Sequence, residues 1–143
     1  MDPREHNEGD TELDEYLNPL LQQAGGNIQT LEYEFLNRAL SDGTLLVCGA
    51  RLWNALHSDS WRHREAAANA FFNYLTSEKV ERKWLRDAAG RKQLFKATMM
   101  VARVACMDKL LQIYFIGLKT LGRALNPPIC TVDIPAKMVN REI

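Results

Sequence analysis

Apolar residues recur along this chain at the three-to-four-residue spacing of amphipathic helices, and no segment alternates convincingly like a strand. The first apolar stripe begins at Leu13 and is followed by Gly25-Gly26, a typical helix stop. A second, shorter helix is expected between Thr30 and Ala39, before the turn residues 41–43. The pattern therefore predicts two helices within residues 10–43.

Two longer helix–turn–helix pairs are predicted in the middle of the chain. The first covers residues 44–75 with its turn at 58–60, and the second covers residues 91–125 with its turn at 106–109. Their offset of about 47 residues is in the range of HEAT-type repeats, whose pairs stack because one pair cannot bury its apolar face alone. The predicted fold class is all-α, a HEAT-like helical-pair solenoid. Its continuous core is expected to include Leu52, Phe71, Val101 and Leu118.

The remaining boundaries are set by helix breakers. Gly90 is predicted to separate a short helix from the longer one that begins near Arg91. Asn126-Pro127-Pro128 ends the second pair, and Ile134-Pro135 is expected to begin a further helix. Three parts are therefore predicted. They are a disordered acidic leader (1–9), N-terminal helices that cap the stack of helical pairs (10–43), and HEAT-like pairs with an incomplete third (44–143).

The formal net charge is zero, but it is divided unevenly along the chain. Residues 1–30 carry seven acids and one base, whereas residues 31–143 carry seventeen bases and eleven acids. An acidic leader on a basic body favours a basic working surface, although a solvated tail and a solvated basic face remain open alternatives. The candidate secondary basic surface is Lys79, Arg82, Lys83, Arg86, Arg91 and Lys92.

Several function classes find little support in the sequence. The three cysteines are widely spaced, which favours reduced core thiols over a metal site or a disulfide framework. We find no catalytic motif, signal peptide or apolar run of membrane-spanning length, so no enzyme activity, cofactor or membrane association is expected. Nucleic-acid binding is disfavoured because Trp84 and Phe95 are the only aromatic residues within the basic run.

Trp61 directly follows the polar turn at residues 58–60, and cationic Arg62 comes next. A large apolar ring beside a cation suits contact with an acidic partner that also offers an apolar patch. The alternative is that Trp61 fills the core between two helices. Arg64 lies one turn further on and is expected to pair with a carboxylate such as Asp108.

The segment Trp61-Arg62-His63-Arg64-Glu65-Ala66 resembles the Trp-x-x-Arg-Glu-Ala pattern of TOG domains, which are HEAT-repeat tubulin-binding modules. The later run from Lys96 through Asp108 to Leu121 is similar as well, most of all to the TOG domain of a ciliary-tip centrosomal protein family. The resemblance covers about residues 44–140 and implies that αβ-tubulin binds along the turns inside the pairs. The implied contact residues are Trp61, Arg62, His63, Met107, Asp108 and Lys109.

A full TOG domain has six helical pairs, and the present sequence offers two and the beginning of a third. The resemblance implies a cytoplasmic, cytoskeletal location, at the cilium tip or the centriole. The alternative function is a helical-repeat adaptor or structural protein of a cytoskeletal or ciliary assembly that does not bind tubulin directly. An exposed Trp61 favours tubulin binding, and a buried one favours the adaptor.

Overall fold

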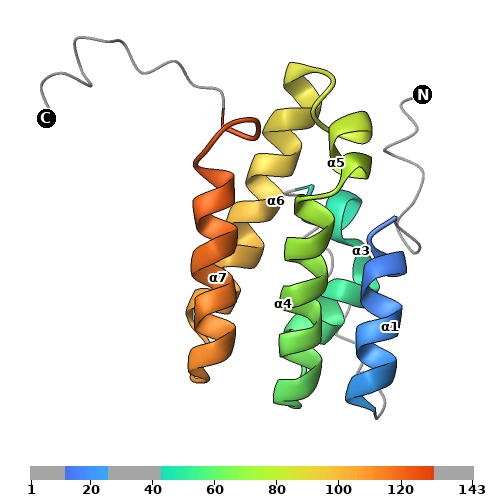
Figure 1. Ribbon diagram of the computed structural model, residues 1–143, viewed down its shortest axis with the longest axis vertical. Helices are drawn as coiled ribbons and strands as arrows, with labels where there is room; N and C mark the ends of the chain where they lie inside the picture. Colours follow the sequence, from blue (N-terminus) through green and yellow to red (C-terminus); the bar gives the residue numbers. More distant parts are fainter. Residues whose placement is uncertain (1–11, 26–42, 131–143) are drawn as a thin grey trace, which may run out of the picture.

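The computed structural model describes residues 12–25 and 43–130, and these residues form helices and turns without any strand (Figure 1). The prediction of an all-α protein is thereby confirmed. The predictions for the leader at 1–9, for a helix at 30–39 and for a helix from Ile134 lie outside the described residues. The helices are α1 (Asp14–Ala24), α3 (Thr44–Leu56), α4 (Trp61–Leu75), α5 (Glu78–Lys83), α6 (Ala88–Cys106) and α7 (Leu111–Ala124).

Two helical pairs, α3/α4 and α6/α7, lie side by side. In Figure 1 the helices α1, α4 and α7 form one row, and α3 and α6 lie behind it. Within the stack α3 packs on α6 and α4 packs on α7, while α1 covers the other side of α4. Both of the turns inside the pairs therefore fall at the same end of the stack, opposite the end that carries α5 (Figure 1).

The helix boundaries agree closely with those predicted from the glycine, proline and polar turn residues, except at Gly90. Helix α1 ends at Gly25, whose φ of 74° belongs to the left-handed region that glycine adopts without strain. Gly90 does not separate two helices, so that prediction is wrong. It lies in the first turn of α6, where its N–H donates to the Asp87 side chain at 2.6 Å. Asp87 is the N-cap, and the break falls before it.

The core forms one cluster, but the prediction that Leu118 belongs to it is wrong. Leu52, Phe71 and Val101 are buried in that cluster, whereas Leu118 is exposed. Small residues face α6 instead because they let the two backbones approach closely, as Gly117 does beneath Cys106. The buried residues of α7 are Ile113, Ile116, Gly117, Thr120 and Ala124.

Candidate protein-binding edge

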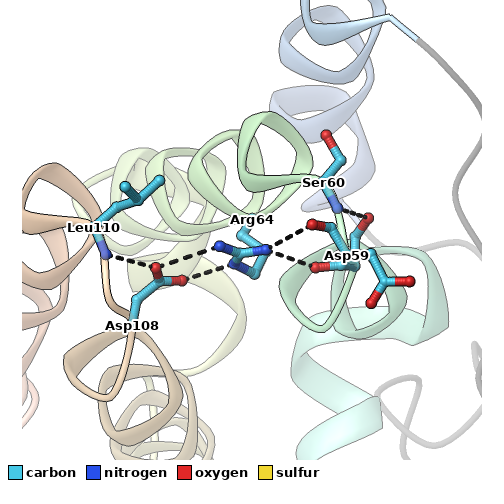
Figure 2. A network of polar contacts seen from close by, with 6 residues as sticks. Asp59, Ser60, Arg64, Asp108 and Leu110 are labelled. Carbon is cyan, nitrogen blue, oxygen red and sulfur yellow. Dashed lines mark hydrogen bonds and ion pairs between the residues drawn. The ribbon is translucent and has the colours of Figure 1, made fainter.

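The α3–α4 turn (residues 57–60) and the α6–α7 turn (residues 107–110) are tied together by one side chain. The Arg64 guanidinium in α4 donates from Nε to the Asp108 carboxylate at 2.8 Å (Figure 2). This confirms the predicted pairing of Arg64 with Asp108. The same guanidinium also donates from Nη1 to the backbone carbonyls of Ser58 at 3.0 Å and Asp59 at 3.1 Å. The two turns are therefore held in a fixed relation.

Each turn is also locked internally by the same kind of hydrogen bond. The Ser58 hydroxyl accepts from the backbone N–H of Ser60 at 3.1 Å, and the Asp108 carboxylate accepts from the N–H of Leu110 at 3.0 Å (Figure 2). In both cases a polar side chain captures the N–H two residues later, which stabilises a tight turn before the next helix. We call the surface formed by these two turns and the first turn of α4 the turn edge.

Asp108 serves this structure as a charged group. Its partial burial alone would raise the pKa, but the hydrogen bonds from Arg64 and from the Leu110 backbone outweigh burial, so the pKa lies below its usual value. The carboxylate is thus ionised and fully engaged within the fold. It is a poor candidate for direct contact with a partner.

Trp61 begins α4 and leaves 41% of its surface exposed, so the exposed interpretation of this residue holds. The Arg62 guanidinium lies 5.4 Å from the centre of the indole ring, a cation–π arrangement that keeps the cation beside the aromatic face. Both residues border a hollow of about 400 Å³ between α1 and α4, which Leu20 also lines. An apolar ring and a cation are thus available together at the turn edge.

His63 is not available to a partner, although it was predicted as a contact residue, because only 3% of its surface is exposed. Its Nε2 donates to the backbone carbonyl of Gly25 at the end of α1. Its Nδ1 forms a second hydrogen bond, 3.2 Å long, with the Ser58 hydroxyl. His63 therefore fastens α1 to the first turn, and we remove it from the candidate contact set.

Met107 and Lys109 are both exposed in the second turn. Together with Leu56 and His57 from the first pair, they line a hollow of about 380 Å³ between the two turns. Burial lowers the pKa of His57, and its hydrogen bond with the carbonyl of Trp53 opposes that effect, so the neutral ring is favoured. The remaining candidate contacts on the turn edge are Trp61, Arg62, Met107 and Lys109.

The charges on the turn edge are balanced rather than basic. Arg64 and Asp108 neutralise each other, and the rest of the edge, taken together with the adjacent Glu65, has as many carboxylates as cations. The other charged residues here are Arg62, Lys109, Asp59 and Glu65. Attraction to an acidic partner at this edge therefore depends on a few local cations and not on a strong positive field.

The predicted secondary basic surface is divided between different faces. Lys79 forms an ion pair with Glu15 of α1, and Lys83 approaches Glu12 at 3.8 Å. The pKa of Lys79 is raised by its hydrogen bond with Glu15. Part of the basic run is thus matched to the acidic start of the described chain. Of the others, Arg86 lies 3.9 Å from Asp87, Arg91 donates to the carbonyl of Leu85 at 3.2 Å, and Arg82 and Lys92 are exposed.

All three cysteines are free thiols, and only Cys48 is fully buried. Burial raises the pKa of both Cys48 and Cys106, which disfavours the thiolate. Within residues 12–25 and 43–130, no group of three or more His, Cys, Asp or Glu side chains could hold a metal ion. Likewise, none of the described helices combines the length and apolarity needed to cross a bilayer.

Comparison of the chain with protein-family models, curated proteins and solved structures found no match in any of the three.

One exposed surface was missed by the sequence reasoning. Helix α7 carries large apolar residues on the side that faces away from the core. The sequence does contain a signal for this surface. Helix α7 is apolar along its buried side and carries a second apolar stripe, whose residues are spaced by four, three and seven. These outward-facing residues are Leu111, Phe115, Leu118 and Leu125.

Proposed function

We propose that this chain is a non-catalytic module that binds tubulin or the microtubule lattice through the turn edge. The observation that carries the proposal is the exposed Trp61 ring at the start of α4, with Arg62 against it. Aromatic and arginine residues dominate the binding energy of many protein interfaces, where they act as anchors. The resemblance of the segment around Trp61 to TOG domains supplies the partner.

The mechanism is docking onto a preformed surface. The Trp61 ring would enter a shallow apolar site on the partner, with Arg62 beside an acidic group at its rim. Met107 and Lys109 would form a second contact one helical pair away. Because Arg64 and the turn hydrogen bonds already order both turns, little conformational entropy would be lost on binding.

We expect the two helical pairs that the structure describes to cover a single tubulin subunit. The charge balance of the turn edge makes Trp61 and Met107 more important than electrostatic attraction. On this proposal the protein acts in the cytoplasm on the cytoskeleton, at the cilium tip or the centriole.

Two binding assays test the proposal on the full chain. One is cosedimentation with taxol-stabilised microtubules, and the other is gel filtration with free αβ-tubulin. Pelleting or co-elution that saturates with tubulin concentration supports the proposal. If the folded chain stays in the supernatant and elutes apart from free tubulin at micromolar concentrations of both, the proposal is wrong.

The adaptor alternative is favoured by a different observation, the exposed apolar row on α7. Large apolar residues that line one exposed helix face are typical of protein interaction surfaces. An adaptor would fail both tubulin assays while still binding a protein through α7. The two surfaces can be inactivated separately because Trp61 and the α7 row belong to different helices.

A further inference from the structure

An apolar row runs along the outer side of α7. Leu111, Phe115, Leu118 and Leu125 each leave between 40% and 63% of their surface exposed. Their spacing places them on one face of the helix, and at about 1.5 Å per residue the row is about 21 Å long. Leu121 continues this row toward α6, where it borders a groove. Such a row is costly to leave in water, which indicates a docking surface.

A cationic row runs along the outer side of the neighbouring helix. Lys92, Lys96 and Arg103 are exposed on α6 at intervals of four and seven residues, which is the spacing of a single helix face. Met99 belongs to the same face. Helices α6 and α7 together carry six bases and no acid, so nothing within these helices offsets the positive charge.

A groove of about 370 Å³ lies between the two rows. It is lined by Met99, Met100, Cys106 and Leu121, with Arg103 at its side. Methionine side chains are flexible and polarisable, so they adapt to the shape of a bound apolar residue. Among the described helices none packs on this side of the α6/α7 pair, which forms one end of the stack (Figure 1).

We propose that this α6/α7 groove binds an acidic amphipathic helix supplied by another protein. The apolar stripe of such a helix would lie on the α7 row and in the methionine-lined groove. Its carboxylates would face the cationic row of Lys92, Lys96 and Arg103. Helix-in-groove recognition uses this division, with apolar anchors for affinity and flanking charges for orientation.

Charge and shape distinguish this occupant from three others. A second copy of the chain would bring its own cationic row of Lys92, Lys96 and Arg103 against the same surface, and like charges repel across an interface. The C-terminal residues 131–143 contain two acids and two bases, so they offer no acidic complement. A flat lipid surface could meet the cations but would not fill a groove between two helices.

The probe is a fluorescein-labelled synthetic peptide of about 16 residues, long enough as a helix to cover the row. It carries leucines at helical spacing on one side and glutamates on the other. One control peptide has lysine in place of glutamate, and a second has the acidic composition in scrambled order. Binding to the full chain is measured by fluorescence anisotropy. We expect the acidic amphipathic peptide to bind at least tenfold more tightly than either control.

Two variants locate the binding surface. The double variant Leu118→Ser/Leu125→Ser and the charge reversal Arg103→Glu should each weaken binding by about tenfold or more. The matched controls are Trp61→Ala, an exposed apolar residue on the turn edge, and Arg82→Glu, an exposed cation of α5. Each control should change the affinity by less than about twofold. Unchanged melting temperatures would show that all variants are folded.

A photoreactive p-benzoylphenylalanine in place of Phe115 identifies the occupant. Cross-linking to the acidic peptide supports the proposal. Cross-linking to residues 131–143, or to a second copy, that persists in excess peptide overturns it. Three other results would overturn it as well. They are equal binding of the three peptides, binding that neither the α7 nor the α6 variant weakens, and stronger binding to phosphatidylserine vesicles than to the peptide.

Discussion

Arg64 and Asp108 lie 44 residues apart in the chain and form an ion pair with an Nε–Oδ2 distance of 2.8 Å. The pair is largely shielded, because 24% of the Arg64 side chain and 7% of the Asp108 side chain are exposed. Since Arg64 also holds two backbone carbonyls of the first turn, one side chain sets the relative position of both turns. The shape of the turn edge therefore depends on it.

Removing either partner of this pair should destabilise the fold. We expect Arg64→Ala and Asp108→Ala to cost about 2–3 kcal/mol each in the free energy of unfolding, because each leaves a shielded charge without its partner. The double variant should cost less than the sum of the two, with a coupling of about 1–2 kcal/mol. Urea denaturation of the four proteins measures this. Additive single effects would show that the pair contributes no coupling energy.

Arg64→Lys is the matched control for geometry. Lysine keeps the charge and can pair with Asp108, but it lacks the planar fork that also holds Ser58 and Asp59. We expect an intermediate loss of about 1–2 kcal/mol, between the parent and the alanine variant. If lysine fully restored stability, the carbonyl hydrogen bonds of Arg64 would be unimportant.

The stability of the protein should fall in acid partly through Asp108. Its pKa is lowered in the folded state, so the unfolded state binds the proton more readily. The stabilisation is complete above the unfolded value of about 3.9 and is lost as the pH falls through the lower folded value. The difference in stability between the parent and Asp108→Asn should therefore shrink below about pH 4. Thermal unfolding from pH 7 to pH 2 tests this, with exposed Asp59→Asn as the control. A difference that stays constant across that range would contradict the role of the charge.

Gly117 and Gly122 lie in the same helix and should respond oppositely to alanine. A Cβ at Gly117 would lie 2.8 Å from the Cys106 backbone nitrogen, so Gly117→Ala must push α6 and α7 apart. We expect a loss of about 1–3 kcal/mol. A Cβ at Gly122 meets nothing within 4 Å, so Gly122→Ala should stabilise the helix by about 0.5–1 kcal/mol. Melting temperatures of the two variants give the comparison, and equal shifts would contradict close packing at Gly117.

The buried contact between Trp84 and Tyr74 fixes α5 to α4. The Trp84 indole Nε1 donates to the Tyr74 hydroxyl at 2.9 Å, and both rings are buried. Tyr74→Phe removes the acceptor and leaves the ring in place, so we expect a loss of about 1 kcal/mol. Half-buried Tyr114→Phe is the control and should change stability by less than about 0.5 kcal/mol. A neutral Tyr74→Phe variant would show that this hydrogen bond adds nothing to stability.

The sequence predicted features that depend on local signals. Gly25 and the polar turn before Trp61 mark helix ends because glycine and short polar side chains act on their own backbone. It did not predict the burial of His63, because the Gly25 carbonyl that binds it lies 38 residues away. It also assigned Leu118 to the core, since leucine is more apolar than Gly117 and Thr120, which are buried in its place. Close approach of two helices favoured small residues there, which hydrophobicity alone does not indicate.

The ion pairs of Lys79 and Lys83 were missed for a related reason. Both lysines belong to a segment of the sequence in which bases greatly outnumber acids. They come to lie next to Glu15 and Glu12 only when the chain folds and α1 packs on α4. Arg64 and Asp108 were matched from the sequence because the turns of neighbouring helical pairs were expected to line up along one edge. Long-range pairs without such a repeat carry no comparable signal.

The most direct test of the tubulin proposal is the affinity of Trp61→Ala for tubulin, measured beside its thermal unfolding. The matched control is Phe115→Ala, an exposed aromatic residue on the outer side of α7. We expect Trp61→Ala to lose about 2 kcal/mol of binding, roughly thirtyfold in affinity, with a melting temperature close to that of the parent. Phe115→Ala should bind tubulin as the parent does. A stable Trp61→Ala variant with unchanged tubulin affinity would contradict docking through the turn edge.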